Sequence, residues 1–386
     1  MNLPEESIGK VMNKEINMKK DPAVELARIF GCLLVVGVHC WINNFGVAIQ
    51  SKSGTYIACI FADGVAVFWI ISGFFMYKNY SYKQTLKRTI KSIVVPMLLL
   101  SAAMFFVLNN YLNGNGWHFI LHSKDDYKWI LNSLLIWTNP VDRLGHFWYL
   151  YVYILLMLCS PVIAAFIKYL EEDTKREKLF LVLTFLLLVW NDLSNNQMGR
   201  FEHHAFAGAF PAAIEGVWGY LLYKYRDRLR KRRYIFISVG AFLGLNVLRM
   251  AIQLGRYHRI QDTATYILYW FSSIGLLCAI CVIVFSFAAI HSRKATVVNR
   301  VICWLASYTF SIYLLHPVVN SFLDMYEVRS CLSEALLKFH IGGVGKEILY
   351  MICIIFIVVS ICLAISCVLR GCKMAMVRVV SGKADK

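Results

Sequence analysis

The chain has 386 residues, of which 59% are hydrophobic and only 16% charged, and its mean hydropathy is +0.57. A water-soluble domain of this length carries far more charge and has no repeated apolar runs of twenty residues, so this composition excludes the soluble classes. The formal net charge of +17 would suit a nucleic-acid partner, but the basic residues lie between apolar segments, which argues against that class.

The apolar segments, taken in chain order, predict an all-α membrane protein. A hydrocarbon core of about 30 Å needs roughly twenty helical residues at ~1.5 Å each, and several segments reach that length. We therefore expect a polytopic integral-membrane helical bundle with about ten transmembrane helices. The expected spans lie at about 26–45, 57–77, 93–112, 148–169, 179–190, 203–223, 234–252, 265–290, 300–320 and 347–369.

The segments outside and between these spans predict the domain organisation and the sidedness. Residues 1–24 are polar and predict an N-terminal tail without a cleavable signal peptide. Residues 25–370 then form one membrane domain, and 371–386 form a C-terminal tail. Most of the 40 Lys and Arg residues fall in alternate connecting segments, above all in "KYRDRLRKRR" at 224–233. The positive-inside rule therefore predicts that both termini are cytoplasmic.

The first span, within "ELARIFGCLLVVGVHCWINN", carries ionisable residues that need a reason. Arg28 and His39 are eleven residues apart, which returns almost to the same helical face and rises about 16 Å. Ionisable residues inside a membrane usually face a cavity or a partner. Taken singly, Arg28 could be an interface anchor and His39 a packing histidine. Together, with Glu25 one turn before Arg28, the two residues indicate a functional face.

The chain resembles the acyltransferase-3 membrane family in several motifs. Arg28 and His39 match the family's Arg, ten residues, His pattern in the first span. The segment "DGVAVFWIISGFFMYKNY" at 63–80 is similar to the second span, and "KRTIKSIVVP" follows it. The segment "HFWYLYVYILLMLCSP" is similar to a central span, and "SYTFSIYLLHP" resembles a late motif. The resemblance runs from about 20 to about 370.

The resemblance is not complete. Asp63 precedes Gly64 instead of following the family's commoner Gly-Val-Asp order, and Trp69 replaces a usual Phe. Lys91 stands where an Arg is common. Relatives with an added extracytoplasmic esterase-like domain or a racemase domain are not matched.

The resemblance implies an O-acyltransferase of bacterial surface glycans, located in the cytoplasmic (inner) membrane. Such enzymes take an acyl group, most often acetyl, from cytoplasmic acyl-CoA and pass it to a sugar hydroxyl of a surface polysaccharide or a lipid-linked glycan. Arg28, Arg88 and Lys91 are then expected to pair with the phosphates of acetyl-CoA or another acyl-CoA. We expect no metal, because Cys278-x-x-Cys281 lies in an apolar span, where buried thiols are the usual interpretation.

For the chemistry, His39 is expected to act either as a general base or as a transient acyl carrier. Asp63 is expected to orient His39, although it could instead cap a helix. His316 would be a further catalytic residue, or an interfacial histidine beside the kink at Pro317. Glu215 lies mid-span and is expected to neutralise a buried cation.

The aromatic residues near 146 suggest how the acceptor would bind. His146, Trp148 and Tyr149 are expected at the outer mouth, where they form either a sugar-binding platform or an interfacial belt. Two other functions remain open from the sequence. The first is a transporter or flippase of a lipid-linked glycan without acyl transfer, and the second is a non-catalytic scaffold or sensor. Membrane lipid is the remaining expected partner, and the acyl group and the acceptor stay undefined.

Overall fold

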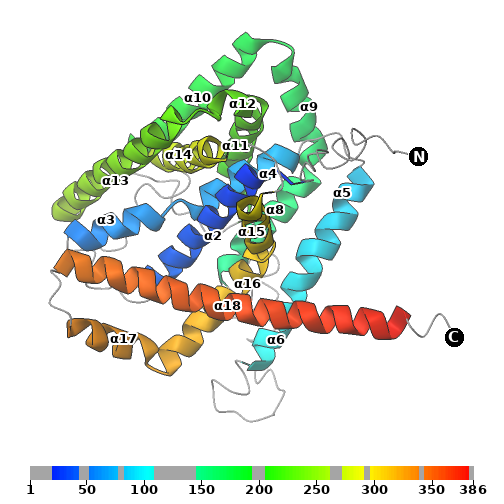
Figure 1. Cartoon of the computed structure of the whole chain (residues 1–386). Helices are drawn as coiled ribbons and strands as arrows, with labels where there is room; N and C mark the ends of the chain where they lie inside the picture. The colour runs from blue at the N-terminus through cyan, green and yellow to red at the C-terminus, as the bar shows by residue number, and fades with distance from the viewer. Residues whose placement is uncertain are drawn as a thin grey trace, which may run out of the picture.

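The computed structural model describes residues 20–42, 52–76, 82–107, 145–193, 205–260, 272–290, 296–338 and 343–381. These residues form helices joined by short turns, without a strand among them, which confirms the all-α prediction (Figure 1). Two further segments lie outside them: the apolar run 129–137, which is too short to cross a membrane and is expected to be interfacial or re-entrant, and the pair His203–His204, which is expected to be solvated. The helices are α2 Pro22–Ile42, α3 Lys52–Phe61, α4 Gly64–Met76, α5 Tyr82–Thr89, the π-helix η2 Ile90–Val94, α6 Val95–Val107, the 3₁₀ turn η4 Gly145–Phe147, α8 Trp148–Leu158, α9 Ser160–Glu171, α10 Thr174–Leu193, α11 Ala205–Lys224, α12 Arg226–Leu229, α13 Arg233–Ile260, α14 Ser273–Ala289, α15 Val297–Ala306, α16 Thr309–Met325, α17 Val328–Leu337 and α18 Gly343–Ser381.

Several helices are long and apolar enough to cross a membrane. Within the described residues, four segments meet the requirement: Pro22–Cys40, Lys52–Met76, Arg233–Gly255 and Gly345–Cys372. Two bent helix pairs would raise the number to six if each made one span. The pairs are α8 with α9, bent by 66°, and α15 with α16, bent by 51°.

This number is smaller than the ten spans expected from the sequence, and the difference has identifiable causes. The α10 helix begins with the charged run "TKREK", which shortens its apolar part. The α14 helix has only 17 residues. The expected spans 93–112 and 265–290 extend into residues outside the described part. Length and composition therefore support a polytopic membrane protein with four to six spans in the described residues.

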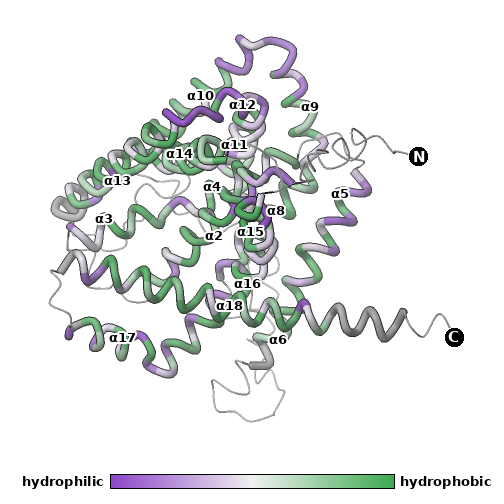
Figure 2. Tube along the Cα trace, viewed as in Figure 1, coloured by the Kyte–Doolittle hydropathy of each residue, from purple (hydrophilic) through white to green (hydrophobic). Residues whose placement is uncertain are grey.

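The spans divide into inner and outer helices. The share of the apolar segment that is buried inside the protein is 61% for α2 and 67% for α3–α4. For α13 and α18 this share is only 17% and 28%. Figure 1 shows α2 and α4 between α13 and α18. Apolar residues dominate α4, α14 and α18, whereas polar residues gather at α12 and at the turn from α9 to α10 (Figure 2). The exposed apolar faces of the outer helices suit a lipid environment.

The α2 helix is the centre of the bundle, because it contributes to three separate apolar clusters. Leu34 belongs to the cluster with α4, α8, α11 and α14. Val36 packs with α3, α16 and α18, and Val35 packs with α6, α8 and α16. A helix that is enclosed in this way is apolar on nearly all sides. Any polar side chain on α2 must therefore meet a cavity or another protein group.

The α4 and α11 helices touch backbone to backbone at three glycines. A Cβ atom added to Gly73 would lie 1.8 Å from the carbonyl oxygen of Gly216. A Cβ atom added to Gly219 would lie 2.0 Å from the carbonyl oxygen of Ile70. Neither backbone oxygen can move without displacing its helix, so only glycine allows this approach. The contact fixes the α4 face that carries part of the site described below.

This contact predicts that Gly73→Ala destabilises the protein. The added methyl group must push α4 and α11 apart, and overpacking of this kind costs about 1–3 kcal/mol. We expect a lower midpoint of thermal unfolding for the purified protein in detergent. Gly240→Ala is the matched control, because a Cβ atom there meets nothing within 4 Å. The control should be neutral or slightly stabilising, and equal stability of the two variants would contradict the close contact.

Candidate functional site

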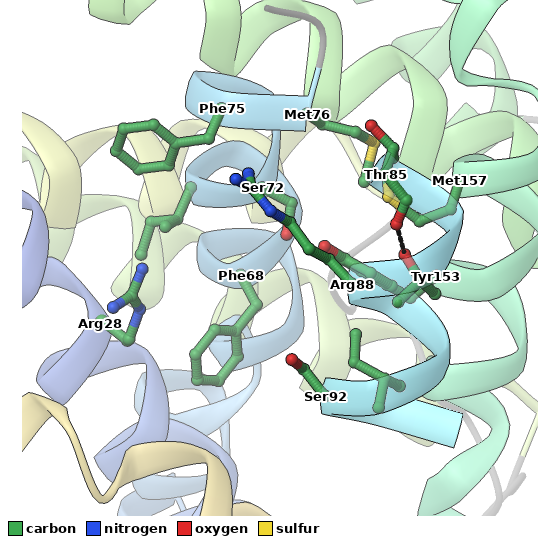
Figure 3. A pocket seen from close by; sticks show the side chains of 13 residues that line it. Arg28, Phe68, Ser72, Phe75, Met76, Thr85, Arg88, Ser92, Tyr153 and Met157 are labelled. Carbon is green, nitrogen blue, oxygen red and sulfur yellow. Dashed lines mark hydrogen bonds between the residues drawn. The ribbon is translucent and has the colours of Figure 1, made fainter. Parts of the chain in front are cut away.

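A cavity of about 380 Å³ lies between α2, α4, α5, η2 and α8. Figure 3 shows Arg28 and Arg88 reaching this space from opposite sides, one from α2 and the other from α5. The structure thus brings together two of the three cations that the sequence predicted for phosphate binding. The third, Lys91, is exposed and is not part of the lining. The remaining lining residues are Phe68, Ile71, Ser72, Phe75, Met76, Thr85, Thr89, Ser92, Ile93, Tyr153 and Met157.

The two arginines are held differently. The Nη1 atom of Arg28 donates to Oε2 of Glu25 at 2.6 Å, and Glu25 itself is buried. This ion pair uses one of the five guanidinium N–H donors and fixes the direction of the others. Arg88 is exposed, and the π-helix η2 begins two residues after it. A π-helical turn is rare and is often found at functional sites.

A row of aromatic rings leads away from this cavity. Tyr153 lines the cavity, and its ring centroid lies 6.5 Å from that of Tyr149. Tyr149 lies 5.7 Å from Tyr313, which in turn lies 5.4 Å from His146. Tyr149 also packs on Trp69 at 4.2 Å. These centroid distances are within the range of direct aromatic contact. The row therefore connects the wall of the cavity to a second group of residues.

Three histidines from distant parts of the chain meet at the far end of this row. His39 comes from α2, His146 from η4 and His316 from α16. Their ring centroids are 4.9 Å apart for His39 and His316, 5.3 Å for His146 and His316, and 6.1 Å for His39 and His146. The sequence predicted His39 and His316 as catalytic and His146 as an acceptor-binding residue. The structure places all three in one cluster.

The hydrogen bonds of His316 define its tautomer. Its Nδ1 atom lies 2.7 Å from the carbonyl oxygen of Tyr313 and 3.2 Å from that of Ile312. A carbonyl oxygen only accepts hydrogen bonds, so in the neutral ring Nδ1 carries the proton and Nε2 carries the lone pair. This Nε2 atom is buried and has no hydrogen-bond partner within the described residues.

A hydrogen bond to its backbone carbonyl group holds His146 in position. The Tyr313 hydroxyl donates to the His146 carbonyl oxygen at 2.5 Å, which fixes the η4 turn against α16. Both ring nitrogens of His146 are buried without a partner in the described part of the chain. Leaving buried polar atoms without partners costs stability. These nitrogens can therefore still form hydrogen bonds, which is unused capacity in the cluster. His39 is the most accessible of the three, since it is partly exposed whereas His146 and His316 are buried.

The other predicted acceptor residues lie beside this cluster. Tyr149 is an inner member of the aromatic row and contacts both Tyr313 and Trp69. Trp148 is partly buried, and its ring lies 6.4 Å from that of Tyr149. Among the described residues, no group of three His, Cys, Asp or Glu side chains is arranged to hold a metal ion.

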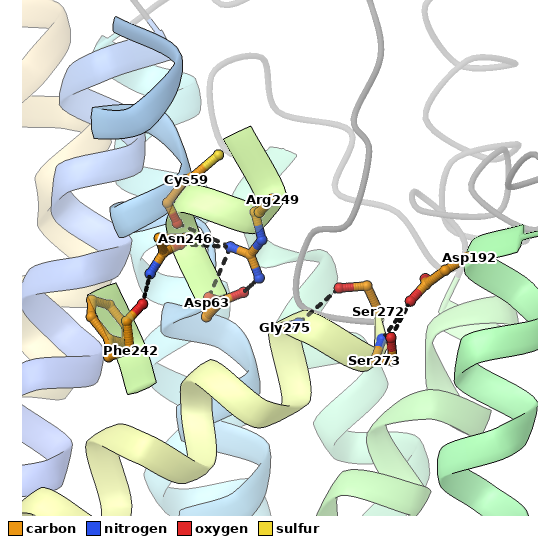
Figure 4. Close-up of polar contacts among 9 residues, drawn as sticks. All are labelled: Cys59, Asp63, Asp192, Phe242, Asn246, Arg249, Ser272, Ser273 and Gly275. Carbon is orange, nitrogen blue, oxygen red and sulfur yellow. Dashed lines mark hydrogen bonds and ion pairs between the residues drawn. The ribbon is translucent and has the colours of Figure 1, made fainter. Parts of the chain in front are cut away.

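Asp63 has a partner that the sequence analysis did not identify. Its two carboxylate oxygens accept from Nη1 and Nη2 of Arg249, each at 2.9 Å, and both side chains are at most 1% exposed (Figure 4). Arg249 also donates to the carbonyl oxygen of Cys59 at 3.0 Å. Asp63 therefore joins the α3–α4 corner to α13, and the expected orientation of His39 by Asp63 has no counterpart in these contacts. The signal in the sequence was Arg249 itself, because an arginine at the end of an apolar span needs a charged or polar partner.

Glu215 on α11 also differs from expectation. It is 1% exposed, and neither carboxylate oxygen has a hydrogen-bond partner within the described residues. The buried cation that it was expected to neutralise is thus not in contact with it there.

One comparison with known proteins gives a match over nearly the whole chain. A family model with the description "Acyltransferase domain" matches residues 21–367. This range contains both arginines of the cavity, the aromatic row and the three histidines. No curated protein and no solved structure matches the chain. The extent of the family match shows that the protein belongs to the acyltransferase-3 family of membrane acyltransferases, in agreement with the helices and apolar spans of the described residues.

Proposed function

We propose that the protein is a membrane-bound O-acyltransferase that moves an acetyl group from cytoplasmic acetyl-CoA to a hydroxyl group of a surface polysaccharide or lipid-linked glycan. One observation carries the proposal: a cavity with two arginines is joined by a row of aromatic rings to a cluster of three histidines. Anion binding and proton transfer are the two tasks that acyl transfer from CoA requires, and each end of the row has residues suited to one of them.

The donor phosphates would bind between Arg28 and Arg88. Guanidinium groups pair with phosphate through two parallel N–H bonds, which gives strength and direction. The apolar and hydroxyl-bearing lining, with Met157, Phe75 and Ser72, suits a long pantetheine arm. His39 lies eleven residues beyond Arg28 on the same helix, a rise of about 16 Å. An extended arm that starts at the arginines can therefore bring its thioester toward the histidines.

The histidines would move the proton of the acceptor hydroxyl. As that oxygen forms its bond to the thioester carbonyl, the proton passes to the imidazole of His39, and it is then delivered to the sulfur that leaves. The alternative is a transient acyl-imidazole on His39, which the hydroxyl then attacks. In both routes the CoA leaves as a thiol and no net proton is consumed. His316 and His146 contact the His39 ring and would hold it in place.

We assign Asp63 a structural role in this scheme, because Arg249 occupies both of its oxygens. We further place the protein in the cytoplasmic membrane with about ten spans and both termini in the cytoplasm, following the distribution of Lys and Arg. The Arg28 end of α2 then faces the cytoplasmic donor, and the histidine cluster lies nearer the opposite side, where a glycan acceptor would arrive.

The donor site predicts that Arg88→Ala weakens acetyl-CoA binding by about 10- to 100-fold, the loss expected for a charged hydrogen-bonding pair. Arg88→Lys should restore only part of the affinity, because an ammonium group lacks the bidentate fork. Calorimetry on the purified protein measures both. Lys83→Ala is the control, since Lys83 is exposed on the same helix and does not line the cavity. Unchanged affinity in Arg88→Ala and in Arg28→Ala would remove both residues from the donor site.

The catalytic assignment predicts that His39→Ala lowers acetyl transfer by at least about 10²-fold, as loss of a general base does, while acetyl-CoA still binds. His39→Gln should fail as well, because an amide cannot accept the proton. Moving the imidazole one position, by Val38→His in the His39→Ala variant, turns it about 100° and should not restore transfer. The measurement is release of free CoA thiol. An active His39→Gln enzyme would make His39 a structural residue.

The structural role of Asp63 predicts that Asp63→Asn destabilises the protein by about 3–5 kcal/mol, because the buried Arg249 charge loses its partner. The double variant Asp63→Leu with Arg249→Met should recover most of that stability and retain acetyl transfer. Thermal unfolding and release of CoA thiol are measured together. A double variant that folds well but has no activity would return Asp63 to the catalytic machinery.

A further inference from the structure

Arg329 on α17 is a buried cation that neither the family resemblance nor the proposed chemistry uses. Its side chain is 6% exposed. Its Nη1 atom donates to the carbonyl oxygen of Cys40 at 2.8 Å, and its Nη2 atom donates to Oδ1 of Asn320 at 2.9 Å. Its Nε atom lies 2.6 Å from Oδ1 of Asp324. One guanidinium group therefore contacts two different helices, α2 and α16.

These two helices carry His39 and His316. Cys40 directly follows His39 on α2, and Asn320 lies one turn after His316 on α16. The Cys40 thiol also approaches Oδ1 of Asn320, at 3.7 Å. The contacts of Arg329 thus lie immediately beside the pair of histidines whose rings are 4.9 Å apart. The spacing of those rings depends on the relative position of the two helices.

The physical reason for an arginine here is the end of α2. The last four carbonyl groups of a helix have no partner within the helix, and the Cys40 carbonyl is one of them. A cation near this end also complements the partial negative charge of the helix terminus. Arg329 supplies the donor and the charge together. The pairing with Asp324 and Asn320 offsets the desolvation of the guanidinium group.

The chain brings Arg329 to this place by a short turn between α16 and α17. The turn contains Glu327 in the left-handed conformation, with a φ angle of 54°, and α17 begins at the next residue. Arg329 is consequently the second residue of α17 and lies against the end of α16. The left-handed conformation is unusual for a residue other than glycine and is retained where the surrounding contacts require it.

We propose that Arg329 is a positioning residue for His39, which acts by tying the carboxyl end of α2 to Asn320 and Asp324 on α16. The inference rests on the proposed function, since it assigns Arg329 the task of holding the acyl-transfer imidazole at a fixed distance from His316. Arg329 touches neither substrate nor the reacting atoms. A displacement of about 1 Å at a reacting group is enough to lower a rate by about 10²-fold.

The first test compares Arg329→Met with Arg329→Lys and with the control Lys338→Met, which removes an exposed cation at the other end of α17. Arg329→Met should lower kcat by about 10- to 100-fold. It should leave KM for acetyl-CoA unchanged, because Arg28 lies near the other end of α2 and Arg88 lies across the cavity on α5. Arg329→Lys should restore part of kcat, and the control should behave as wild type. Equal changes in kcat and KM would overturn the proposal.

The second test places Arg329→Met in the His39→Ala background. If Arg329 acts through His39, the residual rate should not fall further. A second loss of the same size as in the wild-type background would overturn the proposal, because a general structural role affects both backgrounds alike. Should Arg329→Met fail to fold, Asn320→Leu removes the acceptor of Nη2 instead and should give the same pattern in kcat, in KM and in the His39→Ala background.

The third test does not depend on activity. Cys40 is fully buried, so release of the end of α2 in Arg329→Met should speed its labelling by N-ethylmaleimide several-fold, measured by mass spectrometry of the peptide. Cys32 is buried on the same helix and is the internal control, whose labelling should not change. Protection of Cys40 in the variant would refute the tie even in an active enzyme. Absence of acetyl transfer in the wild type would refute the proposed function alone.

Discussion

The α2 helix packs against apolar side chains on every side, through Leu34, Val35 and Val36 toward three different groups of helices. Polar residues on such a helix must meet a cavity or another protein group. Arg28 is tethered by Glu25 at the edge of a cavity, and His39 is surrounded by two other imidazole rings. The position of both groups follows from the enclosure of one helix. The rest of the bundle supplies their partners.

The separation between the two ends suits the chemistry that we propose. Phosphates need fixed cations and access from solution, whereas a thioester must be kept from water until the acceptor arrives. The rings of Tyr153, Tyr149 and Tyr313 fill the distance between the two ends with apolar surface and a few hydroxyl groups. Electrostatic interactions at the histidines are stronger in such a water-poor environment. In this arrangement Arg28 of the proposed anion site and the imidazole of His39 lie on one helix, α2, and are still far apart.

Features that depend on local helical periodicity could be predicted from the sequence. Contacts between residues far apart in the chain could not. The shared face of Arg28 and His39 follows from 3.6 residues per turn. His146 could not be placed with His39 from its spacing, because the 3₁₀ turn that carries it is held by Tyr313, 167 residues further along the chain. Asp63 and Arg249 are separated by 186 residues in the same way. Hydropathy also does not register the bends at 159 and at 307–308, so the sequence could not show that two of the expected spans are bent helix pairs.

Two buried arginines solve the same physical problem at two places in the bundle. A buried charge is stable only with a well-placed partner, and Arg249 and Arg329 each bind a carboxylate and a backbone carbonyl oxygen. Each thereby joins segments far apart in sequence, α3–α4 to α13 in one case and α2 to α16 and α17 in the other. Beside the arginine-lined cavity the joining contact is a neutral hydrogen bond, in which the Tyr82 hydroxyl on α5 donates to the carbonyl oxygen of Leu158 on α8 at 3.1 Å. Of the two arginines, only Arg329 ties helices that carry histidines of the cluster, and a fixed spacing of the imidazoles is what the acyl transfer that we propose would require.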